Sequence, residues 1–323
     1  MTNEGHTQAL WIIGERKAEI RPNTFDTPEG DLVIKTLFTG ISRGTERLVF
    51  EGRVPAGEHE TMRAPFQEGD FSFPVKYGYA CVGQIENGAR AGETIFALHP
   101  HQAQFSLTSA AAVPVPSQVP AGRAVLAANM ETALNIVWDA GIAAGDRVAV
   151  VGCGVVGALT GYLAARIPGT EVCLIDVDPS RAGLAAALGC EFAAPEGAPD
   201  EADVVIHASA TSAGLATAIA LAGMEATVVE ASWYGTGTTE APLGGRFHQR
   251  RLRIVASQVG RIPANHAARW TYRRRLQTAL ALLADPTLDI LISGETAFAD
   301  LAATYGQILD DPSTLCHRVH YGA

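Results

Sequence analysis

The sequence predicts an α/β protein that joins a β-rich part to a doubly wound parallel sheet. Two observations lead to this prediction. Before about residue 120, short alternating runs of polar and apolar residues are separated by Gly, Pro and Asn, which is typical of a partly closed β-barrel. From about residue 121, apolar runs alternate with helix-like stretches, which is typical of a parallel sheet covered by helices. At 323 residues the chain is long enough for two such domains.

The clearest segment begins with Val148–Val151, an apolar run of the kind that is buried on both faces of a parallel sheet. Gly152, Gly154 and Gly157 follow at GxGxxG spacing, and a helical pattern continues to Pro168. A GxGxxG sequence alone is a weak signal, because many turns are rich in glycine. Here strand, turn and helix come in the order of a dinucleotide-binding unit, the Rossmann motif.

Each part of this unit has a physical role. The glycines permit a tight turn, close approach of the backbone to a pyrophosphate, and close helix–strand packing. The helix begins at Val155 and Val156, and the first amides of a helix are free to bind phosphate. The next strand, Val172–Ile175, ends at Asp176. An acidic residue there accepts both hydroxyls of the adenosine ribose and repels a 2′-phosphate, so we expect NAD(H) to be preferred.

Further segments complete the sheet and the chain. Helices are expected at 124–140, 178–189, 214–222, 276–283 and 299–309, and strands at 204–207, 227–230, 252–257 and 317–320. Because the nucleotide-binding unit is complete before the last segment, we expect that segment to return to the β-rich domain. The expected domains are therefore 1–125, 126–264 and a returning 265–323.

Composition restricts the partners and the compartment. The net charge of −10 argues against a nucleic-acid surface, and the basic cluster Arg273–Arg275 is expected to be a solvated face or a subunit contact. The sequence shows no signal segment and no apolar stretch of bilayer length. Its five cysteines are scattered without a CxxC pair, which is typical of reduced packing cysteines. We expect a cytoplasmic protein with neither a membrane nor a nucleic-acid partner.

Four segments, which together span nearly the whole chain, resemble the medium-chain dehydrogenase/reductase superfamily. They are the glycine fingerprint, GISRGTE at 40–46, KYGYACVGQI at 76–85 and LDILISGETAFADL at 288–301. The resemblance implies a Rossmann domain combined with a β-rich, GroES-like catalytic domain, and an NAD(P)-dependent dehydrogenase or reductase. GISRGTE also resembles the branch of bacteriochlorophyllide hydroxyethyl dehydrogenases, but this likeness of a few residues carries no substrate with it.

The sequence departs from the family at the zinc ligands. Ser42 and Tyr79 stand where the resemblance places the cysteine and histidine that bind catalytic zinc, and Ala80 replaces the glutamate beside that histidine. Neither serine nor tyrosine is a usual zinc ligand. The segment that would supply the third ligand offers Glu131 but no cysteine, and the four-cysteine structural zinc lobe is absent. We therefore expect a zinc-less member with no metal site.

The resemblance carries four further cofactor contacts to this chain. Arg43 matches an arginine that contacts the pyrophosphate, and Thr132 matches a threonine behind the nicotinamide. Ser209 follows a strand where the family's backbone passes the nicotinamide ribose. Arg181 matches a basic position beside the adenosine ribose; it fits NAD(H) together with Asp176 but could also tolerate NADP(H). Arg43 could instead be a surface arginine, and Thr132 and Ser209 could be satisfied loop residues.

Without zinc, protein groups must hold the substrate oxygen and move its proton. Tyr79 occupies a former ligand position, and its phenol could donate to a carbonyl oxygen or enolate, or simply form part of the wall. Thr45 resembles the family's proton-relay hydroxyl, although GISRGTE has one residue more than the family segment. His99 matches a pocket position where a histidine would be an acid or base near neutral pH, or a core residue. His101 and Glu131 are second-rank candidates.

The predicted function is a zinc-independent, NAD(H)-dependent oxidoreductase that transfers hydride between nicotinamide and an alcohol/carbonyl substrate. One alternative is NAD(P)H-dependent reduction of an activated C=C bond in an enone or quinone, which needs no metal. A remote alternative is a non-catalytic NAD(H)-binding protein. Trp233 and Tyr234 are expected either to line a substrate wall or to pack at a domain interface. We expect a homodimer, because relatives often pair through the edge of the dinucleotide domain.

Overall fold

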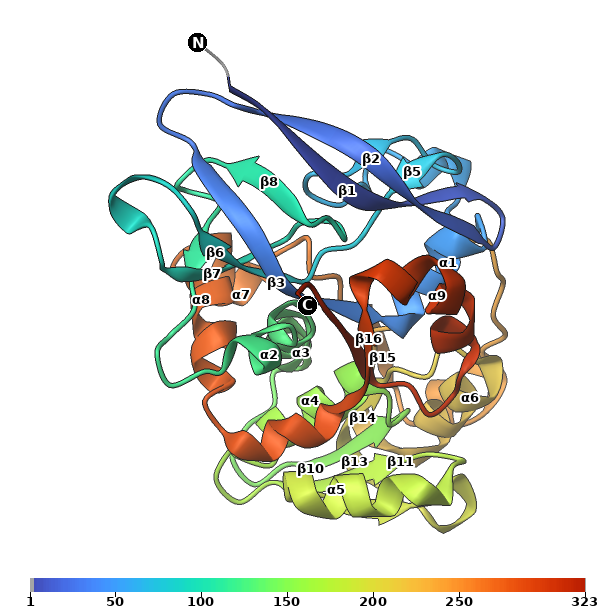
Figure 1. Cartoon of the computed structure of the whole chain (residues 1–323). Coiled ribbons are helices and arrows are strands. Elements are labelled where there is room, and N and C mark those ends of the chain that lie inside the picture. The colour runs from blue at the N-terminus through green and yellow to red at the C-terminus, as the bar shows by residue number, and fades with distance from the viewer. Residues whose placement is uncertain (1–2, 323) are drawn as a thin grey trace. The chain divides into compact units, whose positions relative to one another are not determined.

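The computed structural model describes residues 3–322, which form two compact units (Figure 1). Unit 1 runs to Ala128 and resumes at Leu276, and unit 2 comprises Asn129–Arg275. The return to unit 1 lies later than the expected boundary at 264, because α7 (Ala264–Ala267) and the first residues of α8 (Tyr272–Leu282) belong to unit 2. None of the described helices is long and apolar enough to cross a membrane.

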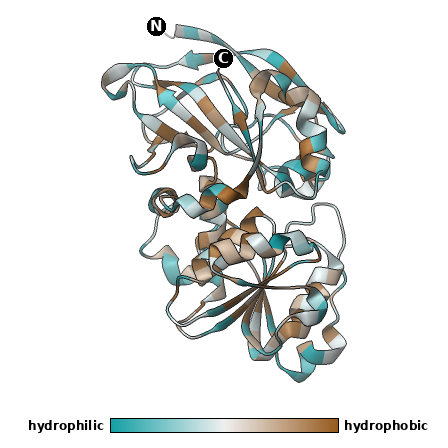
Figure 2. Cartoon of the chain, turned by 60° about the horizontal axis from the view of Figure 1, so that its bottom comes forward, coloured by the Kyte–Doolittle hydropathy of each residue, from teal (hydrophilic) through white to brown (hydrophobic). Residues whose placement is uncertain are grey.

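Unit 2 is built on a six-stranded parallel sheet with the order β12-β11-β10-β13-β14-β15. Apolar residues fill its central strands, as the hydropathy colours of Figure 2 show. The predicted doubly wound sheet is confirmed. Its strands are β10 (Arg147–Val151), β11 (Glu171–Ile175), β12 (Glu191–Ala193), β13 (Ala202–His207), β14 (Ala222–Glu230) and β15 (Arg253–Ala256).

Helices flank this sheet and share its core. They are α3 (Ala127–Ala140), which begins in unit 1, α4 (Val155–Ala164), α5 (Ala182–Leu188) and α6 (Ser212–Leu221). Leu215 and Ile219 of α6 belong to one buried cluster with Val205 of β13 and Val228 of β14. Burying each such side chain contributes about 1.5–3 kcal/mol. The helix between 124 and 140 is interrupted: α2 (Ala121–Ala124) ends before α3 begins.

Local sequence explains where the helices of unit 2 begin and end. Thr211 precedes α6, and its hydroxyl oxygen accepts a hydrogen bond from the backbone N–H of Gly214 at 3.0 Å. Asp178 caps the turn that leads into α5. Gly189 ends α5 with a φ of 82°, a left-handed conformation that glycine adopts without strain.

Unit 1 contains two sheets, and the expected β-rich domain is confirmed. The larger has seven strands in the order β16-β17-β3-β6-β7-β9, with β8 also paired to β3, and the smaller has the order β2-β1-β5-β4. Strand β17 lies between the edge strand β16 and β3, so a late segment of the chain forms an interior strand of a sheet built largely from the first part of unit 1.

The elements of unit 1 fall into long strands, short strands and a few helices. The strands are β1 (Asn3–Gly14), β2 (Lys17–Thr27), β3 (Leu32–Ser42), β4 (Glu68–Gly69), β5 (Val75–Lys76), β6 (Cys81–Ile85), β7 (Thr94–Ala97), β8 (Gln104–Leu107), β9 (Val113–Pro114), β16 (Ile292–Ala297) and β17 (Cys316–His320). The longer helices are α1 (Arg43–Phe50) and α9 (Leu301–Asp310), besides α2 and most of α8.

The expectation that Arg273–Arg275 is a solvated cluster is wrong for its last residue. Arg275 is buried, and its Nε donates to Glu131 Oε1 at 3.0 Å. A second guanidinium nitrogen donates to the side-chain oxygen of Asn135. The reason is helical geometry, because consecutive helix residues point in different directions and only this one points into the core of unit 2. Arg273 and Arg274 are exposed.

Candidate cofactor and catalytic sites

The three fingerprint glycines of unit 2 surround the carboxyl end of β10, and each is needed for a different reason. Gly152 has a φ of 107°, and a Cβ there would lie 2.8 Å from the backbone of Ala208 and Ser209. A Cβ at Gly157 would lie 1.9 Å from the carbonyl oxygen of Gly152, so α4 packs against the turn only because this residue has no side chain. A Cβ at Gly154 would meet nothing within 4 Å. The open space beside Gly154 fits the close approach of a pyrophosphate.

This turn lies at the point where the strand order reverses. β10 has β11 on one side and β13 on the other, and in open α/β sheets ligands bind outside the carboxyl ends of the strands at such a point. Val155 and Val156 open α4 directly after Gly154, so the helix N-terminus directs its amides toward this end of the sheet. The residues present therefore fit the phosphates of a dinucleotide.

Asp176 follows β11 and is half-buried. Its Oδ2 accepts a hydrogen bond from the N–H of Cys153 in the fingerprint turn at 2.6 Å, and its Oδ1 accepts one from the N–H of Asp178 at 3.0 Å. These bonds fix the carboxylate beside the fingerprint turn. Arg181 lies nearby in sequence, with its Nε 3.5 Å from Asp178 Oδ2, so its side chain is directed by an acidic neighbour.

The remaining cofactor candidates are distributed over both units. Ser209 follows β13, and its backbone lies against Gly152, as the close approach described above shows. Thr132 lies on α3 of unit 2 and is partly buried. Arg43 opens α1 of unit 1, where its Nε donates to the carbonyl oxygen of Leu309 at 2.9 Å. Their contacts with a cofactor stay predictions.

In unit 1 the structure brings three of the singled-out hydroxyl groups together. Tyr79 precedes β6, and its phenol is hydrogen-bonded to the side chains of Ser42 and Thr45. Ser42 ends β3 and Thr45 lies in the first turn of α1, so the strand-to-helix junction delivers both. Burial and the neighbouring Glu46 carboxyl group raise the pKa of Tyr79 well above its ordinary value of 10. The phenol therefore keeps its proton at neutral pH and can donate it in a hydrogen bond.

Glu46 has no exposed surface and forms the centre of this site. It accepts hydrogen bonds from the Tyr305 hydroxyl at 2.7 Å and from the backbone N–H of Ser42 at 2.8 Å. His101 Nε2 lies 3.0 Å from the same carboxyl group, and its Nδ1 lies 2.7 Å from the hydroxyl of Thr39. Burying a carboxyl group is costly unless it is hydrogen-bonded, and here every partner is present.

His99 differs from the expectation that it would titrate near neutral pH. Its ring stacks on Phe105 with centroids 3.6 Å apart, and its Nδ1 lies 3.1 Å from the carbonyl oxygen of Pro100. Burial, together with the positive charge of Lys76, lowers the pKa of His99 from 6.5 to about 3. The imidazole is therefore neutral at physiological pH, and a catalytic role for it stays a prediction.

Glu131 is the other second-rank candidate, and its carboxyl group is already engaged. It is buried on α3 and paired with Arg275, as described above. Among residues 3–322 no group of three or more His, Cys, Asp or Glu side chains is arranged so that it could hold a metal ion.

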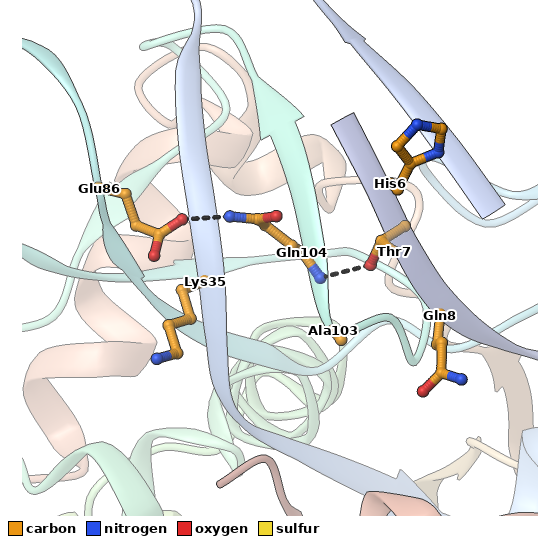
Figure 3. A pocket seen from close by; sticks show the side chains of 7 residues that line it. All are labelled: His6, Thr7, Gln8, Lys35, Glu86, Ala103 and Gln104. Atoms are coloured by element: carbon orange, nitrogen blue, oxygen red, sulfur yellow. Dashed lines mark hydrogen bonds between the residues drawn. The ribbon is translucent and has the colours of Figure 1, made fainter. Parts of the chain in front are cut away.

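A separate polar hollow of about 570 Å³ lies on unit 1 (Figure 3). In its centre Gln104 donates from its side chain to Glu86 and from its backbone to Thr7 Oγ1, the latter at 2.9 Å. Lys35 faces the same hollow. Neither Tyr79 nor any other candidate catalytic residue lines it, so it is no part of the site built around Glu46.

Solved structures share this architecture. L-idonate 5-dehydrogenase from Escherichia coli superimposes with a TM-score of 0.81 and 15% identity, covering 99% of both chains. An alcohol dehydrogenase from E. coli in complex with NADH gives 0.76 and 17%, covering 98% of this chain and 99% of that one. Staphylococcus aureus TarJ in complex with NADPH gives 0.75 and 12%, covering 99% and 100%.

The chain has the fold of these dehydrogenases. The expected combination of a Rossmann domain with a β-rich, GroES-like domain is thereby confirmed. No family model matches the sequence, and no curated protein sequence matches it either. At these identities the likeness establishes the fold, while activity and substrate depend on the site.

Sequence reasoning missed the partners that surround Glu46. Tyr305 lies 259 residues from Glu46 in the chain, and no local pattern connects them. It also missed that His207 and Glu230 end two neighbouring strands in the same register. That signal was present, because both residues end segments predicted as adjacent strands of a parallel sheet.

Proposed function

We propose that this chain is a zinc-independent oxidoreductase that prefers NAD(H) and transfers a hydride between nicotinamide and an alcohol/carbonyl substrate. The observation that carries the proposal is the geometry of the fingerprint turn at the carboxyl end of β10. There a fingerprint turn with open space at Gly154 lies beside the fixed carboxylate of Asp176. The nicotinamide, when bound, supplies the hydride acceptor or donor.

The chain's own contribution to the chemistry is proposed to come from unit 1. Tyr79 keeps its proton, and its phenol can donate to a substrate carbonyl oxygen, the task that zinc performs in the zinc-dependent relatives. Ser42 and Thr45 hold the phenol, and the hydroxyl of Thr45 gives it a route for proton exchange. Ser42 and Tyr79 at the two ligand positions support independence from zinc.

Titration with NADH and NADPH, followed by protein fluorescence on metal-analysed protein, tests the cofactor assignment. We expect NADH to bind at least tenfold more tightly than NADPH, because Asp176 would repel the 2′-phosphate of the latter. An Asp176→Ser variant should lose this preference. Equal binding of both nucleotides by the wild type, or stoichiometric zinc, would show that the assignment is wrong.

Reduction of an activated C=C bond is the second candidate, because a protonated phenol can equally donate to a developing enolate. A panel of ketones, alcohols, enones and quinones with product analysis separates the two reactions. On the active substrate, Tyr79→Phe should reduce kcat by a factor of about 10² or more while the fold is retained. Nucleotide binding without turnover across the panel would favour a non-catalytic binding protein instead.

We also propose a homodimer formed through the edge of the sheet in unit 2. β15 is an edge strand with exposed residues, among them Ile254, which is 37% exposed. An exposed strand edge is a template for pairing with a second copy. Light scattering should show a dimer for the wild type and a monomer for Ile254→Lys. The five free, buried cysteines fit the proposed cytoplasmic location.

A further inference from the structure

A second polar cluster lies in unit 2 at the ends of β13 and β14, and it includes Ser209, the predicted contact to the nicotinamide ribose. His207 and Glu230 are paired in the register of these two parallel strands, so their side chains stand side by side on one face. His207 Nδ1 lies 2.8 Å from Glu230 Oε2, and His207 Nε2 lies 2.7 Å from the hydroxyl oxygen of Ser209. The Glu230 carboxyl group, the His207 imidazole and the Ser209 hydroxyl are thus linked by two consecutive hydrogen bonds.

The hydrogen bonds at Glu230 determine the direction of this series. Its Oε1 accepts from the backbone N–H of Ser232 at 2.8 Å, and its Oε2 accepts from the hydroxyl of Tyr234 at 3.1 Å. Burial alone would raise the pKa of Glu230. The hydrogen bonds from His207 and Ser232 lower that pKa by more than burial raises it, so it lies below its ordinary value of 4.5. An ionised carboxylate accepts only, so His207 donates from Nδ1. In a neutral imidazole with this tautomer, Nε2 carries a lone pair that can accept the proton of Ser209. The Ser209 hydroxyl also lies 3.0 Å from Thr211 Oγ1.

Burial and backbone geometry hold this arrangement in place. His207 has no exposed surface, whereas Ser209 is partly exposed. Ser209 stands on the short turn between β13 and α6, and the next residue, Ala210, has a φ of 54°. A Cβ at Gly214 in the first turn of α6 would lie 2.0 Å from Ser209 Oγ and 2.8 Å from His207 Nε2. The helix can therefore approach the serine only because residue 214 is glycine.

These relations are those of a base-activated serine. A carboxylate that orients a buried imidazole, whose other nitrogen accepts from a serine hydroxyl, recurs on unrelated folds and is recognised by geometry. A nucleophilic serine on a tight strand-to-helix turn at the carboxyl edge of a parallel sheet is one such setting. The first turn of α6 lies against Ser209 Oγ at Gly214, so the positive end of the helix dipole is close to the serine.

We propose that Ser209, His207 and Glu230 form an acyl-transfer site in unit 2 that takes carboxylic esters when no nucleotide occupies the neighbouring fingerprint turn. Ser209 Oγ attacks the ester carbonyl carbon and gives its proton to His207 Nε2. The C–O bond to the alcohol breaks, and the leaving alcohol takes that proton. Water then attacks the acyl-serine, its proton passes through His207 back to Ser209, and the carboxylic acid leaves. Glu230 is the positioning residue of the site.

The test is covalent labelling of the full chain, without added nucleotide, by diisopropyl fluorophosphate. We expect one adduct per chain, located at Ser209 by peptide mass spectrometry, and a burst of nitrophenol when 4-nitrophenyl acetate is added. Ser209→Ala should abolish both. Glu230→Gln should slow labelling by a factor of roughly 10³–10⁴, because the imidazole is then no longer held in the correct tautomer.

Ser212→Ala is the matched control, because its hydroxyl contacts Thr239 at 3.1 Å and lies outside the series. This variant should be labelled at the wild-type rate. His207→Gln should behave like Ser209→Ala. If thermal unfolding shows that His207→Gln does not fold, the labelling rate of Glu230→Gln decides the test instead. Absence of an adduct at Ser209 in the wild type, or an unchanged labelling rate in Glu230→Gln, would overturn the proposal.

Discussion

At the scale of single residues, Glu46 combines complete burial with three hydrogen-bond partners at one carboxyl group. A glutamine has one acceptor oxygen, and its NH₂ group would face donors such as the Tyr305 hydroxyl. We therefore expect Glu46→Gln to lower the free energy of unfolding by about 1–3 kcal/mol, the cost of buried polar groups left unpaired. Urea denaturation followed by circular dichroism measures this change.

The same substitution at an exposed glutamate provides the control for Glu46. Glu19 pairs with Arg21 at the surface, where both side chains are at least 42% exposed. Exposed pairs contribute little, so Glu19→Gln should change the free energy of unfolding by less than about 0.5 kcal/mol. Equal effects of the two substitutions would mean that the carboxyl group of Glu46 is not needed for the buried network.

His99 gives a second prediction at this scale, on the pH dependence of stability. Its pKa is about 3 in the folded chain and near its ordinary 6.5 when unfolded. Between these values the unfolded state binds more protons, so stability rises with pH and is lost on acidification, by up to about 1.4 kcal/mol per pH unit. The variant His99→Phe keeps a ring against Phe105. When the pH falls from 6.5 to 4.5, its free energy of unfolding should therefore decrease by about 2 kcal/mol less than that of the wild type.

Denaturation curves at both pH values measure that difference. The exposed His6 supplies the control, since His6→Gln should retain the pH dependence of the wild type. Carboxyl groups also titrate in this range, and comparing variant with wild type cancels their contribution. If His99→Phe shows the wild-type dependence, the imidazole is protonated in the folded chain.

At the scale of elements, the fingerprint turn makes opposite demands on two of its glycines. At Gly157 an added methyl would collide with the Gly152 carbonyl, so Gly157→Ala should separate α4 from β10 and lower the free energy of unfolding by about 1–3 kcal/mol. At Gly154 a methyl meets no protein atom within 4 Å. Gly154→Ala should leave stability within about 0.5 kcal/mol of the wild type but weaken NADH binding about tenfold or more, by filling the pyrophosphate space.

Each variant serves as the control for the other, with thermal unfolding and NADH fluorescence titration as the two readouts. The pattern expected is a stability defect for Gly157→Ala and a binding defect at unchanged stability for Gly154→Ala. Tight NADH binding by Gly154→Ala would place the dinucleotide away from this turn.

Elements also explain how far the sequence could predict the sites. The fingerprint turn and its acidic neighbour were predictable, because Gly152, Gly154, Gly157 and Asp176 all lie within one short strand–helix–strand segment. The grouping of Tyr79 with Thr45 followed from family resemblance alone. The network around Glu46 was not predictable, because it depends on Tyr305 of α9, a contact between distant parts of the chain. The low pKa of His99 was equally hidden, since it depends on burial and on Lys76, which no sequence pattern specifies.

At the scale of the whole molecule, the fold persists although 15% identity with L-idonate 5-dehydrogenase leaves most residues changed. What both chains must retain is the order of the elements and the pattern of apolar positions, since these determine strand pairing and core packing. In this protein the chain leaves unit 1 after Ala128 and returns to it at Leu276, so unit 1 is formed from two separate parts of the sequence. The stability of unit 1 therefore depends on β17, whose last residue, His320, lies 192 positions beyond Ala128, where the first part of unit 1 ends.

Strand β17 is where this dependence can be measured. It pairs with β16 on one side and β3 on the other, and Leu315 and Val319 are buried, contributing about 1.5–3 kcal/mol each. Deleting it would also leave the ladder of β3 unpaired within a sheet. Because total stability is about 5–15 kcal/mol, we expect a chain ending at Thr314 to lack a cooperative thermal transition for unit 1.

A chain ending at Tyr321, which keeps the hydrogen bond from its backbone N–H to the carbonyl oxygen of Leu37 at 3.0 Å, should unfold like the wild type. A native-like transition in the shorter chain would mean that unit 1 is held together by its N-terminal part alone.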